Sequence, residues 1–393
     1  MLSRWPTRAR VAGFCLVLLC VLPLPARAQS PQSPAAPTDG KPAASLPAPT
    51  DDKSPAEPSS APADLPPPTP VGPEAGQEGK TAPSDSPAPP AGGFSPFFNP
   101  AVGQFPLRAD YRATWFPDEP VTGQPTHLGY VEQNLSFSFP LWQNATDEMS
   151  AAVHVCNELF NTEAVLPDTH QPFPEELWNI RLSTTYRHLF DNGWIGGGTV
   201  SVGSASDKPF EGIREMTAGI NAFLRVPQGE HNAWLFSLAY SSNSQLPIPI
   251  PGVAYVWMPN DYFHANIGLP FLVMYRPWED LTLDFSYMLL TNVHARATYR
   301  VAAPLRIYAG YDWLNESYLL ADRVNADDRF FYYDQRLTGG VQYFFNRHAS
   351  LDLCGGYVFD RFYFEGQSLS DDHHNRIDVG NGPFLSLQTQ IRW

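Results

Sequence analysis

Polar and apolar side chains alternate with a period of two along much of the chain from about residue 101 to residue 393. In PLRADYRATWF, one face carries Leu107, Ala109, Tyr111, Ala113 and Trp115, and the other carries Arg108, Asp110, Arg112 and Thr114. Similar runs are NIRLSTTYR (179–187), LTLDFSYML (281–289) and RIYAGYDW (306–313). Successive side chains of a β-strand point to opposite faces, so these runs predict strands with one apolar and one polar face. They show no comparable helical stripe, and the region is predicted to be all-β.

Two architectures use strands of this kind. A soluble β-sandwich buries the apolar face between two sheets, whereas a transmembrane barrel turns that face outward into lipid and keeps the polar face inside. Several runs extend over about 10 residues, which is the length of a tilted strand that crosses a membrane. Aromatic residues also recur near the ends of the runs, where their rings suit the membrane interfaces. They are Trp115, Phe116, Trp178, Trp194, Trp234, Trp278, Trp313 and Trp393.

The predicted connections alternate between long and short. The long ones cover residues 117–127, 157–177, 205–213, 243–261, 320–330 and 365–382, and the short ones cover 190–193, 227–232, 276–280 and 346–348. Two further tight turns are needed near Thr291-Asn292 and Ala303-Pro304. Outer-membrane barrels have short periplasmic turns and longer external loops. The pattern therefore predicts a transmembrane antiparallel up-and-down β-barrel of about 14 strands, within about 12 to 16, with both termini on the periplasmic side.

The chain ends in the alternating stretch LSLQTQIRW. A last strand closed by an aromatic residue resembles the C-terminal signature of bacterial outer-membrane β-barrels. The resemblance implies that Leu387, Ile391 and Trp393 form a signal for the barrel-assembly machinery, with tryptophan where the family more often has phenylalanine. The segment YLLADRVNADDRFFYYDQRLTGGV (318–341) also resembles an uncharacterised family of exported bacterial barrels with no assigned activity.

The N-terminal 28 residues read as a signal peptide. Arg4, Arg8 and Arg10 precede the apolar run VAGFCLVLLCVLPL, and Ala26-Arg27-Ala28 is a small-x-small cleavage site. Cleavage is predicted after Ala28. A lipoprotein is the alternative, but Leu19 before Cys20 does not suit it. The apolar run is too short for a transmembrane helix, and none is expected elsewhere.

Residues 29–100 are predicted to be a disordered periplasmic linker. Residues 29–94 hold 18 of the 41 prolines, with Phe94 as their only aromatic residue. Such a segment buries too little apolar surface to offset the entropy of ordering it. It is interpreted as an inert linker or as a spacer that contacts the cell wall. The barrel is predicted to cover residues 101–393.

With the apolar face outward, the polar face would line the lumen. The candidate lining residues carry both signs of charge, so strong ion selectivity is not predicted. They are Arg108, Asp110, Arg112, Arg181, Arg187, Glu215, Arg225, Asp284, Arg306, Asp312, Arg336 and Asp352. A water-filled lumen predicts a porin-like pore or transporter for small polar solutes. The alternative is a network of ion pairs that plugs the lumen of a closed structural or surface-binding barrel.

The chain is acidic, with 25 Lys and Arg against 40 Asp and Glu, which argues against nucleic acid as a partner. Outer-membrane lipid is the predicted environment. In SLSDDHHNRID (368–378), Asp371, Asp372, His373 and His374 are candidate ligands for a divalent cation. Adjacent residues seldom converge on one ion without other partners, so no metal or cofactor is predicted. The charges of LLADRVNADDRF (319–330) are expected to form a salt-bridge network within their own loop.

A hydrolase with a site on the barrel rim is the remaining class. It would need a nucleophile, a base and an orienting group within hydrogen-bond reach. His154, His188, His264 and His294 lie in or beside strands, but the barrel contains no G-x-S-x-G motif, so no enzyme is predicted. After signal cleavage, Cys156 and Cys354 remain; one disulfide and two separate small hydrophobic residues are both open.

Overall fold

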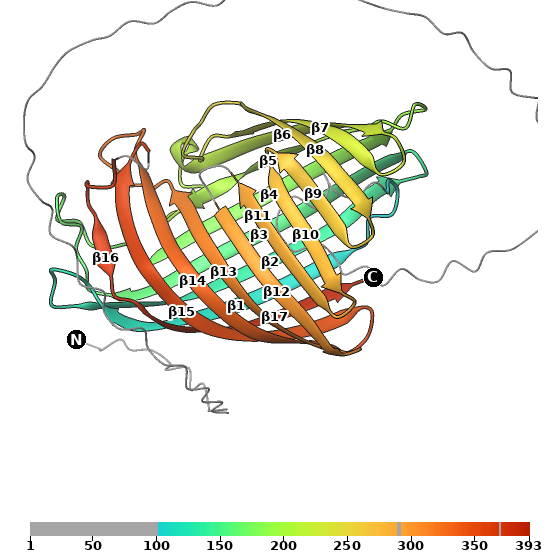
Figure 1. Cartoon of the computed structure of the whole chain (residues 1–393). Helices are drawn as coiled ribbons and strands as arrows, with labels where there is room; N and C mark the ends of the chain where they lie inside the picture. The colour runs from blue at the N-terminus through green and yellow to red at the C-terminus, as the bar shows by residue number, and fades with distance from the viewer. Residues whose placement is uncertain (1–100, 289–291, 369–370) are drawn as a thin grey trace, which may run out of the picture. The chain divides into compact units, whose positions relative to one another are not determined.

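The computed structural model describes residues 101–393 except 289–291 and 369–370, so the predicted signal peptide (1–28) and linker (29–100) lie outside the described residues. The described chain is almost entirely strand (Figure 1). The elements are β1 (Arg108–Pro120), β2 (His127–Gln143), β3 (Asp147–Thr162), β4 (Glu176–Leu189), β5 (Ile195–Ser206), the short 3-10 helix η1 (Ile213–Glu215), β6 (Met216–Gln228), β7 (Asn232–Ser241), β8 (Ile250–Asn260), β9 (Phe263–Gly268), β10 (Phe271–Trp278), β11 (Leu281–Met288), β12 (Asn292–Ala302), β13 (Leu305–Tyr318), β14 (Arg329–Phe344), β15 (Ala349–Gly366), β16 (Ile377–Val379) and β17 (Gly382–Arg392). No helix in this part of the chain has the length and apolar character needed to span a membrane.

The strands close into a ring. Each strand from β1 to β15 pairs antiparallel with the next along the chain, β15 pairs with β17, and β17 pairs back with β1. The closing seam runs from Arg108 opposite Arg392 to Trp115 opposite Leu385. The described residues thus form a closed up-and-down barrel of 16 strands, and the short β16 adds to one end of β15. The predicted all-β antiparallel barrel is confirmed.

The predicted number of about 14 strands is too low, and the error lies between residues 243 and 276. The predicted long connection 243–261 leaves only one strand in this stretch, whose prolines at 247, 249, 251 and 259 would disfavour a central strand. The structure instead places three strands there, β8, β9 and most of β10, and the tight turn 261–262 joins β8 to β9. Pro251 is accommodated within β8, opposite Leu238 of β7.

Long and short connections lie at opposite ends of the barrel, as predicted. The long loops 121–126, 163–175, 207–215, 242–249, 319–328 and 367–381 gather at one end, which also carries β16 (Figure 1). The turns 144–146, 190–194, 229–231, 261–262, 279–280, 303–304 and 345–348 lie at the other end, beside the start of β1 and the end of β17. The short 269–270 connection is an exception at the loop end, and residues 289–291 lie outside the described residues.

The two faces of the strands differ as the alternation predicted. On β1, Trp115 points outward and is 54% exposed, whereas its neighbour Thr114 points inward and is 3% exposed. Across the seam, Ser386 of β17 is also buried, and its hydroxyl lies 2.9 Å from that of Thr114. Leu385 beside it is 52% exposed on the outside. The barrel therefore presents apolar side chains outward and polar side chains to its lumen.

Candidate functional site

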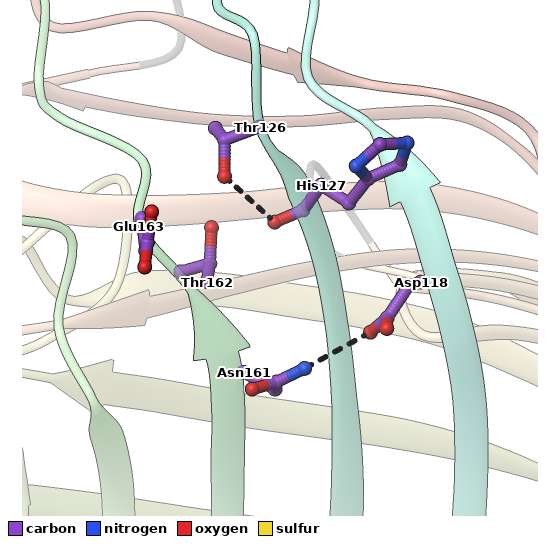
Figure 2. Close-up of a pocket in the computed structure, with 6 residues that line it drawn as sticks. All are labelled: Asp118, Thr126, His127, Asn161, Thr162 and Glu163. Atoms are coloured by element: carbon purple, nitrogen blue, oxygen red, sulfur yellow. Dashed lines mark hydrogen bonds between the residues drawn. The ribbon is translucent and has the colours of Figure 1, made fainter.

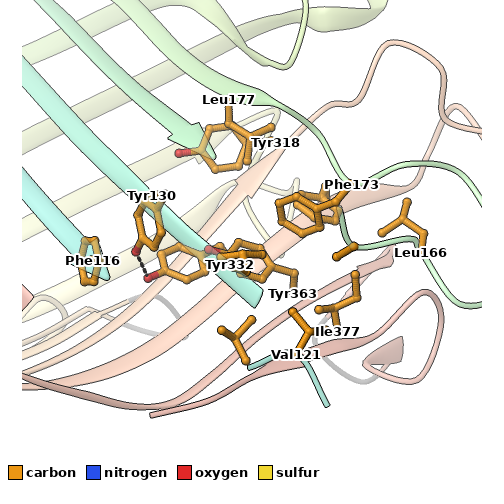
Figure 3. Close-up of a cluster of buried hydrophobic side chains, with 14 of the residues drawn as sticks. Phe116, Val121, Tyr130, Leu166, Phe173, Leu177, Tyr318, Tyr332, Tyr363 and Ile377 are labelled. Carbon is orange, nitrogen blue, oxygen red and sulfur yellow. Dashed lines mark hydrogen bonds between the residues drawn. The ribbon is translucent and has the colours of Figure 1, made fainter. Parts of the chain in front are cut away.

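Aromatic and aliphatic side chains fill the loop end of the barrel (Figure 3). We call this cluster the loop-end plug. It consists of the buried residues Phe116, Val121, Leu128, Tyr130, Ala164, Leu166, Phe173, Leu177, Ala205, Tyr318, Leu320, Phe330, Tyr332, Val358, Tyr363, Ile377, Val379 and Phe384. Its members come from the strand ends next to the loops and from the loops themselves, so the loops fold into the mouth instead of extending from it.

Ring contacts hold the plug together. Phe116 stacks on Tyr130 with centroids 4.2 Å apart, and Tyr332 stacks on Tyr363 at 4.8 Å. The hydroxyls of Tyr130 and Tyr332 lie 2.6 Å apart, which satisfies two polar atoms inside the cluster. Phe173 packs edge-on against Tyr363 at 5.0 Å. The rings of β1, β2, β14 and β15 thereby meet the loop between β3 and β4.

Asn375 ties two of these loops to each other. This fully buried residue has a φ of +49°, a left-handed conformation that asparagine tolerates. Its side-chain oxygen accepts hydrogen bonds from the backbone N–H groups of Asp168 and Thr169, and its side-chain nitrogen donates to Glu365 of β15. Its own N–H donates to the Asp168 carboxylate at 2.6 Å. The 163–175 loop is therefore fixed to the 367–381 loop.

A second set of contacts joins opposite walls of the barrel. Around the ring, β5 and β13 are equally far apart in both directions. At the loop end, however, the N–H of Leu319 donates to the carbonyl oxygen of Ala205 at 2.7 Å, and the N–H of Ala321 donates to Asp207 at 2.8 Å. We call the contacts between the 205–215 and 319–323 segments the cross-barrel clamp.

Arg323 is the central side chain of the clamp. Its guanidinium donates to the carbonyl oxygens of Leu320 and Arg214 and lies 3.6 Å from Glu215, with both charged side chains 6% exposed. Lys208 forms an exposed ion pair with Asp322 at 2.7 Å, and this hydrogen bond raises the pKa of Lys208. A salt-bridge network within the 319–328 loop was predicted. The ion pairs of Asp322 and Arg323 instead run across the barrel, to Lys208 and Glu215. Glu215 was predicted on a lumen-facing strand, but it lies in η1 of the 207–215 loop.

A layer of buried charges lies next to the plug, on the side that faces the short-turn end, and this direction is called below. Arg336 of β14 contacts Asp334 at 2.8 Å and Glu132 of β2 at 3.6 Å, and it lies 4.9 Å from the ring centroid of Phe116. Arg361 of β15 is 2% exposed and donates to the carbonyl oxygen of Gly380. These contacts link β1, β2, β14 and β15 below the aromatic rings.

In the middle of the barrel, two inward-facing arginines are exposed to solvent. Arg181 of β4 lies opposite Gly203 and His154 and is exposed. The side chain of Arg112 on β1 is 45% exposed, although it lies 3.9 Å from the largely buried Glu132. A solvent-accessible polar lumen therefore lies below the charged layer.

The other predicted lining residues also lie on the inward face of their strands. His294 contacts Asp312 at 2.5 Å and Asp284 at 3.7 Å, so three neighbouring strands, β11 to β13, contribute to one cluster. Asp352 accepts a hydrogen bond from Tyr308 at 2.7 Å. Arg306 lies over the ring of Phe344 at 4.5 Å.

Four further lining residues lie toward the short-turn end. Arg187 forms a buried ion pair with Glu148 at 3.2 Å. Arg108 and Asp110 are neighbours on the inward face of β1, and Arg225 is partly buried opposite Ile195 and Leu235. The structure therefore brings only part of the predicted set together, and it does so in separate clusters along the barrel wall.

The segment before β1 enters the barrel at the short-turn end. Val102 packs into a buried cluster with Ile195, Phe223, Ala233, Leu235, Ala254 and Val256. The N–H of Gly103 donates to the Glu148 carboxylate at 3.0 Å, and the N–H of Phe105 donates to Gln143. The segment from Val102 to Phe105 thus lies against the inner wall at this mouth.

The candidate metal ligands of the 367–381 loop have other partners. Asp371 accepts hydrogen bonds from its own loop, and Asp372 pairs with Arg376 at 2.7 Å. His374 lies 3.2 Å from Asp168, whereas His373 is almost fully exposed. Within the described part of the chain, no three His, Cys, Asp or Glu side chains converge as a metal site.

The cysteines and the remaining histidines are dispersed over the wall. Cys156 of β3 and Cys354 of β15 are free, and β17, β1 and β2 separate their strands. His154 lies 3.0 Å from the hydroxyl of Ser136, and His188 contacts Asp147 at 2.7 Å. His264 lies on β9, beside Met274 of β10.

A shallow pocket lies on the rim of the loop end (Figure 2). It is lined by Asp118, Thr126, His127, Asn161, Thr162 and Glu163. Within it, the side-chain nitrogen of Asn161 donates to Asp118 at 3.3 Å. The pocket is open and polar, and it lies outside the plug.

Several residues of the closed end were missed by the sequence analysis. Glu158 belongs to β3, but the polar stretch NELFNTE around it was read as the start of a loop. Glu132, Glu316 and Asp334 share the inward face of their strands with residues of the plug and the charged layer. Extending the period-two pattern of each run by a few residues would have found all four.

No model of a known protein family and no curated protein matches the chain. Similar solved structures include an outer-membrane channel from Pseudomonas putida F1, with 10% identity over 75% of this chain and 98% of that chain and a TM-score of 0.34. The TodX monoaromatic hydrocarbon channel (deltaS2 mutant) is 10% identical over 76% of this chain and 91% of that chain, with a TM-score of 0.33. The β domain of the Bordetella autotransporter BrkA is 9% identical over 74% of this chain and 100% of that chain, with a TM-score of 0.29. Similarity at these TM-scores is too low to assign a function, and the barrel architecture is established by the strand pairing of this chain alone.

Proposed function

We propose that the protein is an outer-membrane β-barrel that conducts small polar solutes when the loop-end plug and the cross-barrel clamp are displaced. The observation that carries the proposal is the solvent exposure of Arg181 and Arg112, which face the lumen. Charged side chains in a filled barrel would be buried and paired, as Arg336 is. A hydrated lumen of this kind is suited to conduct once its closed end opens.

The outward face supports a membrane location. Leu182, Leu353 and Leu385 point out from three strands and are each more than half exposed. Soluble monomers seldom expose a continuous apolar surface of this extent. A closed ring also leaves no unpaired strand edge, which lipid would penalise by several kcal/mol per unsatisfied group. With the predicted signal peptide, these features favour the bacterial outer membrane.

The lining supports small polar solutes without a strong preference for one sign of charge. The exposed arginines are accompanied by Asp284, Asp312 and Asp352 on the same inner surface. We expect weak ion selectivity, because acidic and basic groups both line the wall. No cofactor is part of the proposal.

Single-channel recording in planar bilayers tests the proposal. The wild type would be compared with a variant in which a short Gly-Ser turn replaces residues 163–175, since this loop contributes Ala164, Leu166 and Phe173 to the plug. We expect steady conductance steps from the loop-deleted barrel and rare openings from the wild type. A variant without residues 29–94 controls for the linker. A folded, heat-modifiable loop-deleted barrel that never conducts would overturn the proposal.

A reversible lock gives a second test on the same chain. Ala205→Cys and Leu319→Cys place two thiols where the opposite walls are hydrogen bonded. Cys156→Ala and Cys354→Ala remove the native thiols from this background. Oxidation should silence the loop-intact channel, and reduction should restore its openings.

The plug itself favours a second candidate, a closed structural or surface-binding barrel. In that case the contacts of Asn375 and Arg323 would hold the long loops as a fixed surface and would not gate a pore. Silence from both the wild type and the loop-deleted barrel would favour this candidate.

Two partners belong to the proposal. Leu387 and Ile391 point outward from β17 and are 44% and 38% exposed, and Trp393 is 64% exposed at its end. These side chains are available to the barrel-assembly machinery before the seam with β1 closes. The linker of residues 29–100 is proposed to contact the cell wall.

A further inference from the structure

Two carboxyl groups meet beneath the loop-end plug. Glu158 extends from β3 and Glu316 from β13, strands that are not neighbours in the ring. The hydroxyl oxygen of Tyr318 lies 3.0 Å from Glu158 Oε1 and 3.0 Å from Glu316 Oε2. A phenol carries a single hydrogen and can donate one hydrogen bond. Both contacts are satisfied when one of the two carboxyl groups carries a proton and donates a hydrogen bond to the phenolic oxygen.

The environment of the two groups identifies Glu158 as the protonated one. Glu158 is 2% exposed, and its Oε2 is buried without a hydrogen-bond partner in the described residues. An ionised carboxylate with such an oxygen would be strongly unfavourable. Glu316 is less buried than Glu158, and neither of its oxygens is a buried atom without a hydrogen-bond partner in the described residues. The resulting chain of hydrogen bonds runs from Glu158 to the Tyr318 oxygen and from the Tyr318 hydroxyl to Glu316.

Neighbouring charges do not neutralise the pair. Arg336 is engaged by Asp334 and Glu132, and Arg361 donates to a backbone carbonyl. The titratable and charged groups that surround the pair are Arg112 on β1, Tyr130 and Glu132 on β2, Cys156 on β3, Tyr332, Asp334 and Arg336 on β14, and Arg361 and Tyr363 on β15. Arg336 is already shared with two further carboxylates, and within the described residues no ion pair joins Arg361 to either carboxyl group, so neither arginine is positioned to pair with a second negative charge at Glu158.

We propose that Glu158 is a proton switch that keeps the loop end of the barrel closed, an inference that rests on the proposed channel function. As the pH rises, Glu158 loses its proton to solvent, and two carboxylates then face the same phenol. Their repulsion acts between β3 and β13 and separates the walls that the plug and clamp hold together. The closed state binds one proton more than the open state, so closure is favoured at low pH. The closed-to-open ratio falls by at most about tenfold per pH unit.

Loop separation can be measured without conduction. Ile213 and Val324 lie on the two loops of the clamp and are 89% and 82% exposed, so Ile213→Cys and Val324→Cys accept spin labels readily. Cys156→Ala and Cys354→Ala complete the background. The distance between the labels would be recorded from about pH 5 to about pH 9 in the full mature chain in lipid, beside single-channel openings of the unlabelled protein.

Three variants test whether the proton on Glu158 controls closure. Glu158→Gln replaces the protonated carboxyl with an amide that always donates, and it should keep the labels close and the channel closed at every pH. Glu316→Gln removes the second negative charge and should reduce the pH dependence. Glu230→Gln, on the exposed 229–231 turn at the other end of the barrel, is the matched control and should behave as the wild type.

The outcomes separate the switch from the channel. A label distance that increases with pH in the wild type and the Glu230→Gln control, but not in Glu158→Gln, supports the switch even if no variant conducts. An unchanged distance in the wild type, or an equal response in Glu158→Gln and Glu230→Gln, overturns it. In that case, conduction by the loop-deleted barrel would leave the proposed channel function intact.

Discussion

The backbone N–H of Leu319 donates a hydrogen bond of 2.7 Å to the carbonyl oxygen of Ala205, although the two residues belong to opposite walls of the barrel. A round barrel of 16 strands would separate opposite walls by roughly 30 Å, given the usual strand spacing and tilt. The loop ends of β5 and β13 must therefore bend inward. The strand number implies a wide lumen, and this contact together with the plug closes one end of it.

Arg323 holds this closure through buried contacts. Arg323→Ala would leave the Glu215 carboxylate without its cation in a site where both side chains are 6% exposed. We expect a loss of about 3 kcal/mol in the free energy of unfolding, because an unpaired buried charge is strongly unfavourable. Urea unfolding of the refolded barrel in lipid vesicles measures it.

Lys208→Ala is the matched control for this prediction. Lys208 pairs with Asp322 in the same two loops, but both side chains are largely exposed. We expect no measurable change in stability from it. Equal effects of Arg323→Ala and Lys208→Ala would show that the clamp does not depend on the buried pair.

Asn375 provides a test that separates backbone conformation from side-chain contacts. Asn375→Gly keeps the φ of +49° accessible but removes the hydrogen bonds to Asp168, Thr169 and Glu365. Asn375→Ala removes the same bonds and adds backbone strain. We expect proteolysis of the 163–175 loop to accelerate in both variants, and more in Asn375→Ala. A loop as resistant as in the wild type in both variants would contradict the role assigned to this residue.

The sequence predicted the wall of the barrel better than its closed end. Alternation placed Thr114 inside and Trp115 outside because lipid and lumen impose opposite requirements on successive residues of a strand. Leu166, Phe173 and Ile377 follow no such period, since they lie in loops or the short β16. Their inward packing depends on contacts with distant rings such as Tyr363, which no local pattern encodes.

The residues of the proposed switch illustrate the same limit. Glu158 and Glu316 are far apart in the sequence, and each alone resembles an ordinary polar residue on a strand. Only ring closure and the inward bend of the walls bring both to Tyr318. The inward direction of each side chain was predictable from strand period, whereas their meeting across the lumen was not.

Gly103 positions the segment at the short-turn mouth. It has a φ of +78°, and an added Cβ would lie 1.8 Å from the carbonyl oxygen of Asn144. Gly103→Ala should therefore displace the segment and expose Val102. Maleimide labelling of Val102→Cys, in the background without native cysteines, should become several-fold faster.

Gly123→Ala is the control for the Gly103 variant. Gly123 has the same φ of +78°, but an added Cβ there meets no atom within 4 Å. Gly123→Ala therefore introduces the same unfavourable positive φ at an alanine, but no steric clash. Equally slow labelling of Val102→Cys in both variants would mean that the segment is not held by this close contact.

The orientation of the wall is tested by two adjacent residues of β17. Leu387 points outward and is 44% exposed, whereas its neighbour Gln388 points inward beside Arg112 and Asp352. Leu387→Arg would place a charge in the hydrocarbon core, so we expect a loss of about 2–4 kcal/mol in unfolding free energy measured in vesicles. Gln388→Arg places the same charge in the hydrated lumen next to a carboxylate, and we expect a change of under about 1 kcal/mol. The reverse order would mean that the apolar face does not contact lipid, and the outer-membrane assignment would then fail.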